Sequence, residues 1–437
     1  MMALTANSNI EINGSGVDTN GGAFDQSNAG SFGNDMTYGG TAAVVSGVFS
    51  CTGTSSITSS AAIFTSSMLG NTVNPVGVAG GPWIITTVTS STAVVVDTTY
   101  GTPPTFTSVA GFIGGPWLTL DRWASIFATS GNLLQTTYLK YGTYTPASAL
   151  TFSNGNNSIN LVGYYQSRGD ITAAANKTYR PVIQGGTVIV GATLLKGTNN
   201  NFGTLYNLIF DGNSSNIQLC YGFDITYNCR FQNSTNLTPF NCMAEECEFF
   251  SLVGGNVLNS FNSLYIGCGT ITLNHGDLRN AIVLNSIGYA LESTGNTGEL
   301  QNCTFFGAVT GMGGMDTWAG YFKNSLIFNC GAALNVGNGY GGNPLEIMVL
   351  NCASDAAILS GTQRNLVALT ANPFINSAAT ITDLASARAA FALNNTAGGG
   401  ALCKAAGTPQ YLDIGAVQSA PSGGGGMPPL WRPGFRK

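Results

Sequence analysis

Charged side chains are scarce in this chain of 437 residues: Asp, Glu, Lys and Arg together make up 8%, against about 25% in a typical soluble protein. Long surface helices depend on Lys and Glu, so this composition argues against a helical fold. A net charge of −5 also argues against nucleic-acid binding over a broad face. Because 44% of the residues are apolar, the chain can still form a hydrophobic core and is not of the disordered type.

Long apolar runs are missing as well. The longest, such as AVVV and GTVIVGATLL, fall far short of the about 20 residues of a transmembrane helix, so we expect no membrane insertion. The start, MMALTANSNIEINGSG, lacks the basic segment and the sustained apolar segment of a secretory signal peptide. We therefore expect synthesis and assembly in a cytoplasm.

Histidine and closely paired cysteines are nearly absent. The chain has one histidine, and its ten cysteines form no CxxC pair, the closest two being Cys242 and Cys247. A structural zinc site is therefore not expected, and no motif indicates another metal or a cofactor. Most cysteines lie in strand-like runs, where a buried free thiol behaves as a small hydrophobe. Free thiols are the favoured interpretation and disulfides are the alternative.

The chain is rich in Gly, with 59 residues, and in Ser, Thr and Asn, and it contains a recurring strand motif. The motif is a polar residue, most often Asn, followed by a small residue and then by alternating apolar residues. Its anchors are Asn207, Asn228, Glu246, Asn280, Asn302 and Asn324. They are 18 to 22 residues apart, except for one step of 34 that contains a further strand candidate, SLYIGCGTITL at 263–273.

This period predicts an all-β fold, a parallel β-helix over residues 135–380. Each coil is too short to bury its own apolar side, whereas stacked coils share one continuous core. Asn suits the corners because it tolerates the left-handed conformation and its amide can bond the equivalent amide of the next coil. A β-sandwich with evenly spaced strands is the alternative.

The segments on either side of this solenoid have a different composition. Residues 1–119, with Gly/Pro and Thr/Ser turns between strand-like runs, are expected to form a small antiparallel β domain. LDRWASIFATSGNLL at 120–134 is the best candidate for an N-terminal cap helix. A C-terminal cap is expected at 381–420, with a short helix that starts at Asp383, and a glycine-rich linker and tail at 421–437.

Three segments resemble a known family: VDTNGGAFDQS near the N-terminus, TTYLKYGTYTP at the start of the solenoid, and FALNNTAGGGALCKAAGTPQYLDIGAVQ at 391–418. They are similar to right-handed parallel β-helix proteins of the pectate-lyase-like superfamily, found mostly in tailed-bacteriophage and environmental viral sequences. The resemblance implies a virion surface or tail-associated protein. Phage β-helix proteins often form trimers, and some cleave surface polysaccharides.

The favoured function is accordingly a structural virion protein, such as a head fibre, a decoration protein or a tail spike, that binds host surface glycans. The expected partners are other virion proteins, further copies of the chain in a homo-oligomer such as a trimer, and a bacterial surface polysaccharide. The alternative is a β-helix depolymerase, a hydrolase or lyase acting on such glycans.

LNHGDLR at 273–279 is the first candidate for enzymatic chemistry. In a strand, His275, Asp277 and Arg279 would alternate onto one face, where an Asp–His pair beside an Arg can act in acid–base chemistry. The favoured alternative is a glycine-containing turn in which His and Asp bond the backbone or each other.

A second candidate is the pair Glu246 and Glu248 in MAEECEFF. Two carboxylates at period two, about 7 Å apart on one strand face, can bind Ca²⁺ or form an acid/base pair. The favoured alternative is that both glutamates are solvated and that their charges disfavour pairing of this strand with the edge of another sheet.

Glycan-binding candidates come from aromatic residues beside polar groups. Tyr164 and Tyr165 lie in GYYQSRGD, and Trp318 and Tyr321 lie in GMDTWAGYF. Such rings can stack on sugars, although burial of one ring of each pair is the more common outcome.

The tail PSGGGGMPPLWRPGFRK is the candidate for anchoring a partner. Its aromatic and basic residues are Trp431, Arg432, Phe435, Arg436 and Lys437. Trp and Arg are enriched at binding hot spots, and the glycines form a flexible spacer. The alternative is a disordered tail with no partner.

Overall fold

The structure of the chain is a computed structural model that divides into two compact units, Met1–Ile225 and Thr226–Lys437. Their boundary falls inside the range 135–380 that was predicted as the solenoid, and each unit is described by itself. The residues that the structure describes are 9–12, 45–68, 72–79, 83–98, 101–114, 118–121, 123–124, 134–152, 158–165, 170–171, 177–185, 193–197, 203–235, 238–274, 277–285, 292–294, 298–307, 315–316, 320–331, 347–355, 362–407 and 413–418.

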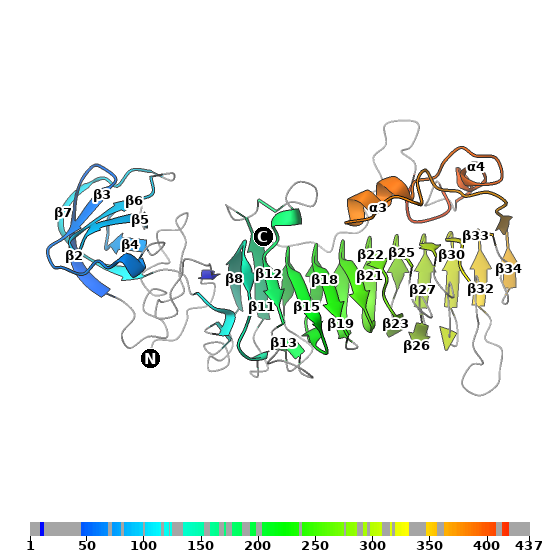
Figure 1. Cartoon of the computed structure of the whole chain (residues 1–437), viewed down its shortest axis with the longest axis horizontal. Coiled ribbons are helices and arrows are strands. Elements are labelled where there is room, and N and C mark those ends of the chain that lie inside the picture. The colour runs from blue at the N-terminus through cyan, green and yellow to red at the C-terminus, as the bar shows by residue number, and fades with distance from the viewer. Residues whose placement is uncertain are drawn as a thin grey trace. The chain divides into compact units, whose positions relative to one another are not determined.

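Unit 1 contains a small antiparallel barrel, closed in the strand order β2-β3-β6-β5-β4-β7 (Figure 1). Alternation along β3 and β6 turns every second residue inward, as a half-buried strand requires. Phe49, Trp83 and Val94 are among the residues of its core. Its elements are β2 (Val45–Thr52), β3 (Ser56–Ser59), η1 (Ser66–Met68), β4 (Thr72–Pro75), β5 (Trp83–Ser90), β6 (Ala93–Val96) and β7 (Thr105–Gly114).

The rest of unit 1 is built from parallel strands in three sheets. The first holds β1 (Asn9–Ile12), β8 (Leu134–Lys140), β11 (Ser158–Tyr164) and β14 (Thr204–Tyr206). The second holds β9 (Thr143–Tyr144), β12 (Val182–Gln184) and β15 (Ile209–Ser215), with the 3-10 helix η2 (Lys177–Tyr179) just before β12. The third holds β10 (Leu150–Phe152), β13 (Thr193–Gly197) and β16 (Gln218–Tyr221).

Two sequence expectations for unit 1 need adjusting. Residues 9–12 pair in parallel with β8, so this strand belongs to the parallel sheet although it lies within the range 1–119 assigned to the small β domain. In the range 120–134, the described residues before Leu134 are helical, whereas Leu134 itself begins β8. Trp123 is buried and packs edge-on against Phe152 at 4.7 Å between ring centroids.

Unit 2 stacks parallel strands into two long sheets. Sheet A contains β17 (Ile225–Tyr227), β19 (Thr238–Glu245), β21 (Gly254–Phe261), β24 (Leu278–Arg279), β27 (Gly298–Gln301), β30 (Gly320–Lys323), β32 (Ile347–Leu350) and β34 (Thr362–Arg364), with β23 (Thr270–Asn274), β26 (Glu292–Thr294) and β29 (Met315–Asp316) branching from β21. Sheet C contains β18 (Arg230–Ser234), β20 (Glu248–Leu252), β22 (Leu264–Ile266), β25 (Ile282–Leu284), β28 (Thr304–Phe306), β31 (Leu326–Phe328), β33 (Ala353–Ser354) and β35 (Val367–Ala368). The predicted fold class, an all-β solenoid of parallel strands with a small antiparallel β domain, is confirmed.

Each coil of unit 2 turns from sheet A into sheet C at a residue in the left-handed conformation. These residues have φ between 49° and 59° and are Asn228, Glu246, Asn262, Asn280, Asn302, Asn324, Asn351 and Asn365. Asn302 donates its side-chain amide to Asn280 at 2.7 Å, and Asn324 donates to Asn302 at 2.7 Å. The predicted corner role of Asn is therefore confirmed, and Asn262 divides the long step of 34 residues into two coils.

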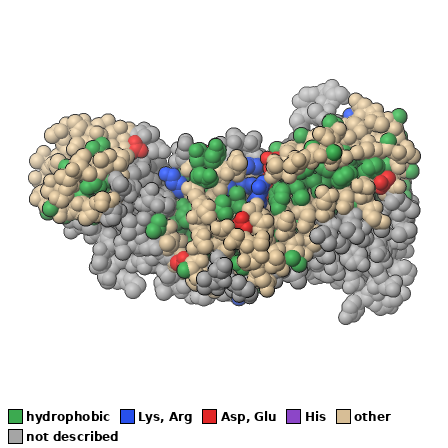
Figure 2. Space-filling view, in the orientation of Figure 1, with side chains coloured by type: hydrophobic (Ala, Val, Ile, Leu, Met, Phe, Trp, Pro, Cys, Tyr) green, Lys and Arg blue, Asp and Glu red, His purple; other side chains and the backbone are tan. Residues whose placement is uncertain are grey.

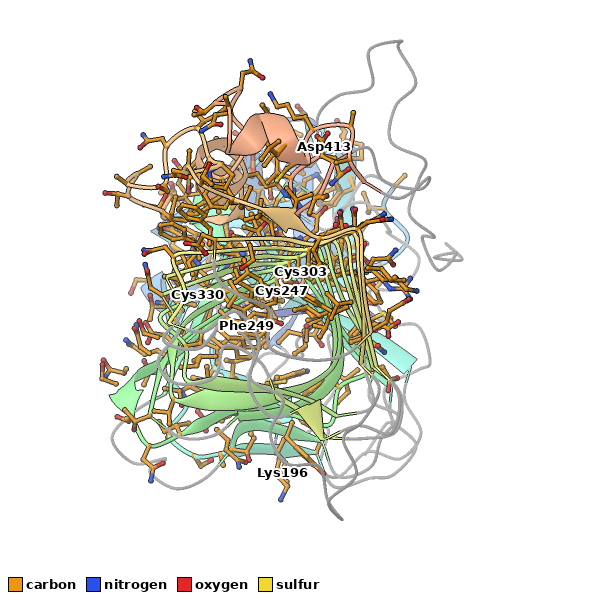
Figure 3. The ribbon with its side chains drawn as sticks, turned by 90° about the vertical axis from the view of Figure 1, so that its right-hand side faces the viewer. Lys196, Cys247, Phe249, Cys303, Cys330 and Asp413 are labelled. Atoms are coloured by element: carbon orange, nitrogen blue, oxygen red, sulfur yellow. The ribbon has the colours of Figure 1, made fainter. Side chains whose placement is uncertain are left out.

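After every corner except Asn365, the next residue points inward and is small, whereas Leu366 is 38% exposed. This column consists of Cys229, Cys247, Ser263, Ala281, Cys303, Ser325 and Cys352, all fully buried. Larger side chains fill the core two positions further along, where Phe249 stacks on Tyr265 at 4.5 Å. Figure 3 looks along the stack and shows Cys247, Phe249 and Cys303 inside the coils.

The described cysteines are free thiols, in agreement with the favoured interpretation of the sequence. Burial raises the pKa of Cys303 and of Cys352 to about 12, since a thiolate would lose its hydration there. These thiols therefore act as small core residues and not as nucleophiles.

The described residues after β35, 369–407 and 413–418, form a C-terminal segment that lies along the outer face of sheet C (Figure 1). It contains α3 (Leu384–Ala390), with the predicted N-cap Asp383 in a capping box with Ser386, and α4 (Gly400–Cys403). The outward positions of sheet C carry an apolar stripe in register, consisting of Phe250, Ile266, Leu284, Phe306 and Phe328. In Figure 2, apolar side chains gather as a band along this part of unit 2.

Aromatic contacts join the segment to this stripe. Phe306 meets Phe391 at 5.2 Å and Phe374 at 5.8 Å between ring centroids. A C-terminal cap was expected at 381–420, at the end of the solenoid, whereas this segment covers the side of the coils. The physical reason is the stripe itself, because exposed Phe and Ile residues in one row favour a cover of their own.

The motif YLDIGAVQ binds the segment to the row of corner asparagines. Asp413 is buried, and its backbone oxygen accepts a hydrogen bond from the side chain of Asn324 at 2.8 Å. Gln418 donates to the side-chain oxygen of Asn302 at 3.1 Å. Figure 3 shows Asp413 in the segment above the coils. The part of this motif that the structure describes therefore has an architectural role.

Candidate functional site

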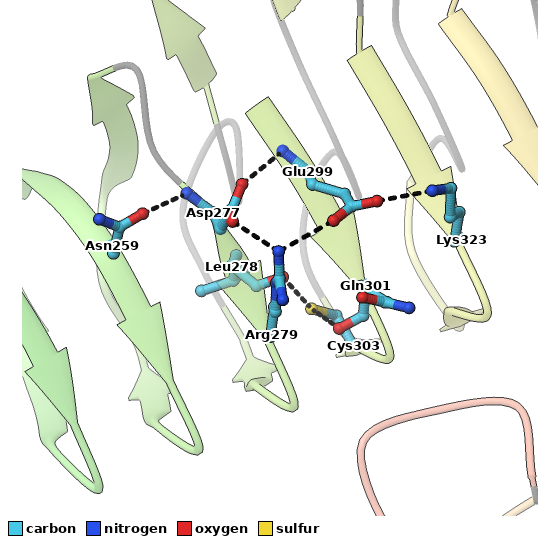
Figure 4. Close-up of polar contacts among 8 residues, drawn as sticks. All are labelled: Asn259, Asp277, Leu278, Arg279, Glu299, Gln301, Cys303 and Lys323. Carbon is cyan, nitrogen blue, oxygen red and sulfur yellow. Dashed lines mark hydrogen bonds and ion pairs between the residues drawn. The ribbon is translucent and has the colours of Figure 1, made fainter. Parts of the chain in front are cut away.

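The ion-pair network of sheet A contains two of the predicted catalytic residues (Figure 4). Arg279 on β24 donates to Asp277 at 2.8 Å and to Glu299 on β27 at 3.0 Å. Lys323 on β30 pairs with the other oxygen of Glu299 at 2.6 Å. The network thus joins three successive coils through alternating charges, with 23% to 33% of each side chain exposed.

Every carboxylate oxygen of this network has a partner within the chain. The second oxygen of Asp277 accepts a hydrogen bond from the backbone N–H of Glu299 at 3.1 Å. The backbone N–H of Asp277 donates in turn to the side chain of Asn259 at 2.8 Å. Because Leu278 is buried between Asp277 and Arg279, these two side chains share the outer face, as the alternation in the sequence predicted.

His275 lies outside the described residues, so the predicted Asp–His pair stays a prediction. What the structure brings together from LNHGDLR is an Asp–Arg ion pair, and it adds Glu299 and Lys323. Neither was among the residues predicted from the sequence, because they belong to the next two coils. The signal for Lys323 was the coil period, since Lys323 is in register with Gln301 and Gln301 is in register with Arg279. Glu299 lies two residues before Gln301 on β27, so alternation predicts that it shares the face of Gln301.

Glu246 and Glu248 do not lie on one strand. Glu246 is the left-handed corner residue, whereas Glu248 lies on β20 with its side chain fully buried. The expected shared face is therefore wrong, because the turn at Glu246 redirects the chain between the two residues. A role in catalysis stays a prediction for both.

Glu248 holds the start of helix α3. One carboxylate oxygen accepts the Arg230 Nε–H at 2.9 Å, and the other accepts the backbone N–H of Leu384 at 3.0 Å. Arg230 also donates to the backbone oxygen of Thr382 at 2.7 Å. A buried carboxylate with a cation and a helix N-terminus as its partners is well compensated. Arg388 of the same helix lies near Glu246, and its burial lowers the pKa of its guanidinium while the charge of Glu246 raises it.

The predicted glycan-binding tyrosines separate into a core residue and a surface residue. Tyr164 is 4% exposed. Tyr165 packs its ring on Tyr179 at 4.0 Å and meets Tyr141 at 5.4 Å. Tyr141 and Tyr179 were not among the residues predicted from the sequence. Tyr141 was detectable from the coil register, since Lys140 pairs with Tyr164.

The other predicted positions lie outside what the structure describes. Trp318 is one of them, and so is the side chain of Tyr321, whose backbone lies in β30. The same holds for the five tail residues Trp431, Arg432, Phe435, Arg436 and Lys437.

The described residues contain neither a cluster of metal ligands nor a membrane-spanning helix. No three His, Cys, Asp or Glu side chains among them are grouped so that they could hold a metal ion. None of the helices in this part of the chain is long and apolar enough to cross a membrane.

Comparison with known proteins finds one weak structural similarity and no similar sequence. No family model matches the chain, and no curated protein matches its sequence. Among solved structures, the catalytic domain of a GH87 α-1,3-glucanase in complex with tetrasaccharides is similar at 12% identity, over 75% of this chain and 84% of that one, with a TM-score of 0.24. A TM-score this low supports no conclusion about activity.

Proposed function

We propose that the chain is a structural, surface-exposed protein of a bacteriophage virion that binds host surface glycans. The observation that carries the proposal is that the charged side chains described above pair with one another between coils or hold the C-terminal segment. Asp277, Arg279 and Glu299 link successive coils, and Glu248 and Arg230 hold the C-terminal segment on sheet C. Side chains engaged in this way serve the rigidity of the stack.

The composition and the sequence resemblance support the same function. A surface poor in charge and rich in hydroxyl and amide groups suits a protein that persists outside a cell. The segments that resemble phage β-helix proteins favour a place on the particle. We extend the proposal to attachment through the tail at 421–437 and to a homo-oligomer, such as a trimer, on the particle.

The test is the location of the protein in particles. Gradient-purified virions should contain it by mass spectrometry, and antibodies against the chain should label intact particles in electron micrographs. A protein present in the lysate but absent from purified virions would overturn the proposal. Deletion of residues 422–437 should leave a folded protein that is not incorporated, and normal incorporation would remove the tail from the proposal.

The depolymerase alternative has its own assay. The purified chain is incubated with host capsule or lipopolysaccharide, and released oligosaccharides are measured by size-exclusion chromatography. We expect no cleavage. Cleavage that is lost in Asp277→Asn or His275→Ala, but kept in a surface control such as Asp355→Asn, would establish the enzyme in place of a purely structural protein.

A further inference from the structure

Three tyrosine rings form a cluster on unit 1. Tyr141 follows β8, Tyr165 follows β11, and Tyr179 ends the 3-10 helix η2. The rings of Tyr165 and Tyr179 are stacked, 4.0 Å apart and 18° from parallel. Tyr141 lies 5.4 Å from one and 5.6 Å from the other, at 80° and 82° to them.

These distances define the arrangement. A ring that is almost equally far from both members of a stacked pair lies beside the pair, next to the edges of both rings. Tyr141 therefore closes one side of the stack at a right angle, and such edge contacts are favourable for aromatic rings. The cluster has one defined geometry and is not three independent side chains.

The backbone beneath the cluster is held firmly. The Tyr141 N–H donates to the backbone oxygen of Tyr164 at 2.7 Å, and the Tyr165 N–H donates to the carboxylate of Asp170 at 2.9 Å. Tyr179 is followed by Arg180, which is 1% exposed and donates its Nε–H to the backbone oxygen of Lys177 at 2.9 Å. Anchors of this kind reduce the entropy that is lost when a ligand binds.

The rings nevertheless stay open to solvent. Tyr141 is 47% exposed and Tyr179 is 37% exposed, although each contacts two other rings. A flat aromatic surface matches the C–H face of a pyranose ring, and phenol hydroxyls can exchange hydrogen bonds with sugar hydroxyls. A core cluster would instead bury these rings, as the Phe249–Tyr265 stack does.

We propose that Tyr141, Tyr165 and Tyr179 form a binding site for pyranose units of a glycan chain. The inference rests on the proposed function in its glycan-binding part, because it identifies the residues that contact the sugar. It differs from the sequence-based candidates by excluding Tyr164, which lies in the core, and by adding Tyr141 and Tyr179.

The test uses the full chain on an array of bacterial capsule and O-antigen oligosaccharides, with affinities for the bound glycans then measured by calorimetry. Tyr141→Ala and Tyr179→Ala should each weaken binding by about tenfold, the equivalent of losing one ring contact. Tyr179→Phe keeps the stack and should lose less. Tyr221→Ala, a partly exposed tyrosine on β16, is the matched control and should bind like the unaltered chain.

Three results would overturn the site: no glycan bound by the unaltered chain, binding by Tyr141→Ala and Tyr179→Ala as strong as that of the unaltered chain, or a change in the oligomeric state of these variants by light scattering. The last result would identify the cluster as an interface between copies. Thermal unfolding of each variant excludes a folding defect. Because the array uses isolated protein, its outcome is independent of virion incorporation, so the site and the virion assignment can fail separately.

Discussion

Sheet A and sheet C of unit 2 are formed by the same coils, yet their outer faces have opposite chemistry. Sheet C carries the stripe that contains Phe250, Phe306 and Phe328, and the C-terminal segment covers it. The described outer face of sheet A carries the ion-pair network around Arg279 and Glu299, which stays partly exposed. The corners and the inward residues serve both sheets alike.

The difference shows that two sets of positions in a coil have independent roles. Inward positions and corners define the stack, whereas outward positions decide whether a face receives a cover. Burial of apolar area contributes about 25 cal/mol per Å², while an exposed ion pair contributes about 0–1 kcal/mol. Sheet C should therefore dominate stability, and the four predictions below test this from the largest expected effect to the smallest.

Phe306→Ala should be the most damaging change. It removes contacts to Phe328, Phe374 and Phe391. Because Phe306 is partly buried, we expect a loss of about 3 kcal/mol, the lower end of the range for Phe→Ala in a core. Urea unfolding of the full chain measures the loss, and faster hydrogen exchange in α3 would locate it. Lys323→Ala on sheet A is the control, and an equal loss in both variants would contradict the comparison.

Glu248→Gln should cost less, about 2 kcal/mol, because the shape is kept while charge-assisted hydrogen bonds are lost. The amides at the start of α3 should exchange faster, since the helix N-terminus loses its anion. Glu246→Gln, at the neighbouring corner, is the matched variant and should leave these amides nearly unchanged. If both variants behave alike, Glu248 does not hold the helix.

Two variants of Asn302 distinguish the contribution of the left-handed corner conformation from that of the side-chain hydrogen bonds between successive corner asparagines. Asn302→Ala and Asn302→Gly both lose the hydrogen bonds to Asn280, Asn324 and Gln418. Only Ala is strained at a φ of 59°, so it should be less stable than Gly by about 1 kcal/mol. Equal unfolding midpoints for the two variants would show that conformation is not what selects Asn at this corner.

The Glu299–Lys323 pair should have the smallest effect. A double-mutant cycle of Glu299→Ala and Lys323→Ala should give a coupling energy of about 0.2–1 kcal/mol. The coupling should shrink further in 1 M salt, about where the screening length falls to 3 Å. A coupling energy as large as the loss of stability in Phe306→Ala would contradict the expectation that sheet C contributes more to stability than sheet A.

The corners were predictable because their chemistry is local. Asn228, Asn280 and Asn302 are recognisable by a small residue after them and alternating apolar residues beyond. Glu246 was placed at a corner by its position in the series alone, and the structure confirms it. The same residue was also grouped with Glu248 as a carboxylate pair, which ignored the turn that its own corner role implies.

The partners of outward side chains were less predictable. Glu248 meets the backbone of Leu384 across 136 residues, and Tyr165 stacks on Tyr179, which follows it by 14 positions in the chain. Alternation shows that a side chain points outward, but not what covers it. That depends on where a distant segment packs.

The sequence by itself therefore determined the coil: its period, its left-handed asparagine corners, its small inward cysteines and the capped helix at Asp383. These follow from the conformational preferences and sizes of neighbouring residues. Only the tertiary structure decided that the C-terminal segment covers sheet C, that Glu248 serves a helix N-terminus, and that three tyrosines form one exposed cluster. The physical reason is that such contacts join residues from different coils and segments, whose meeting depends on the register of the whole stack.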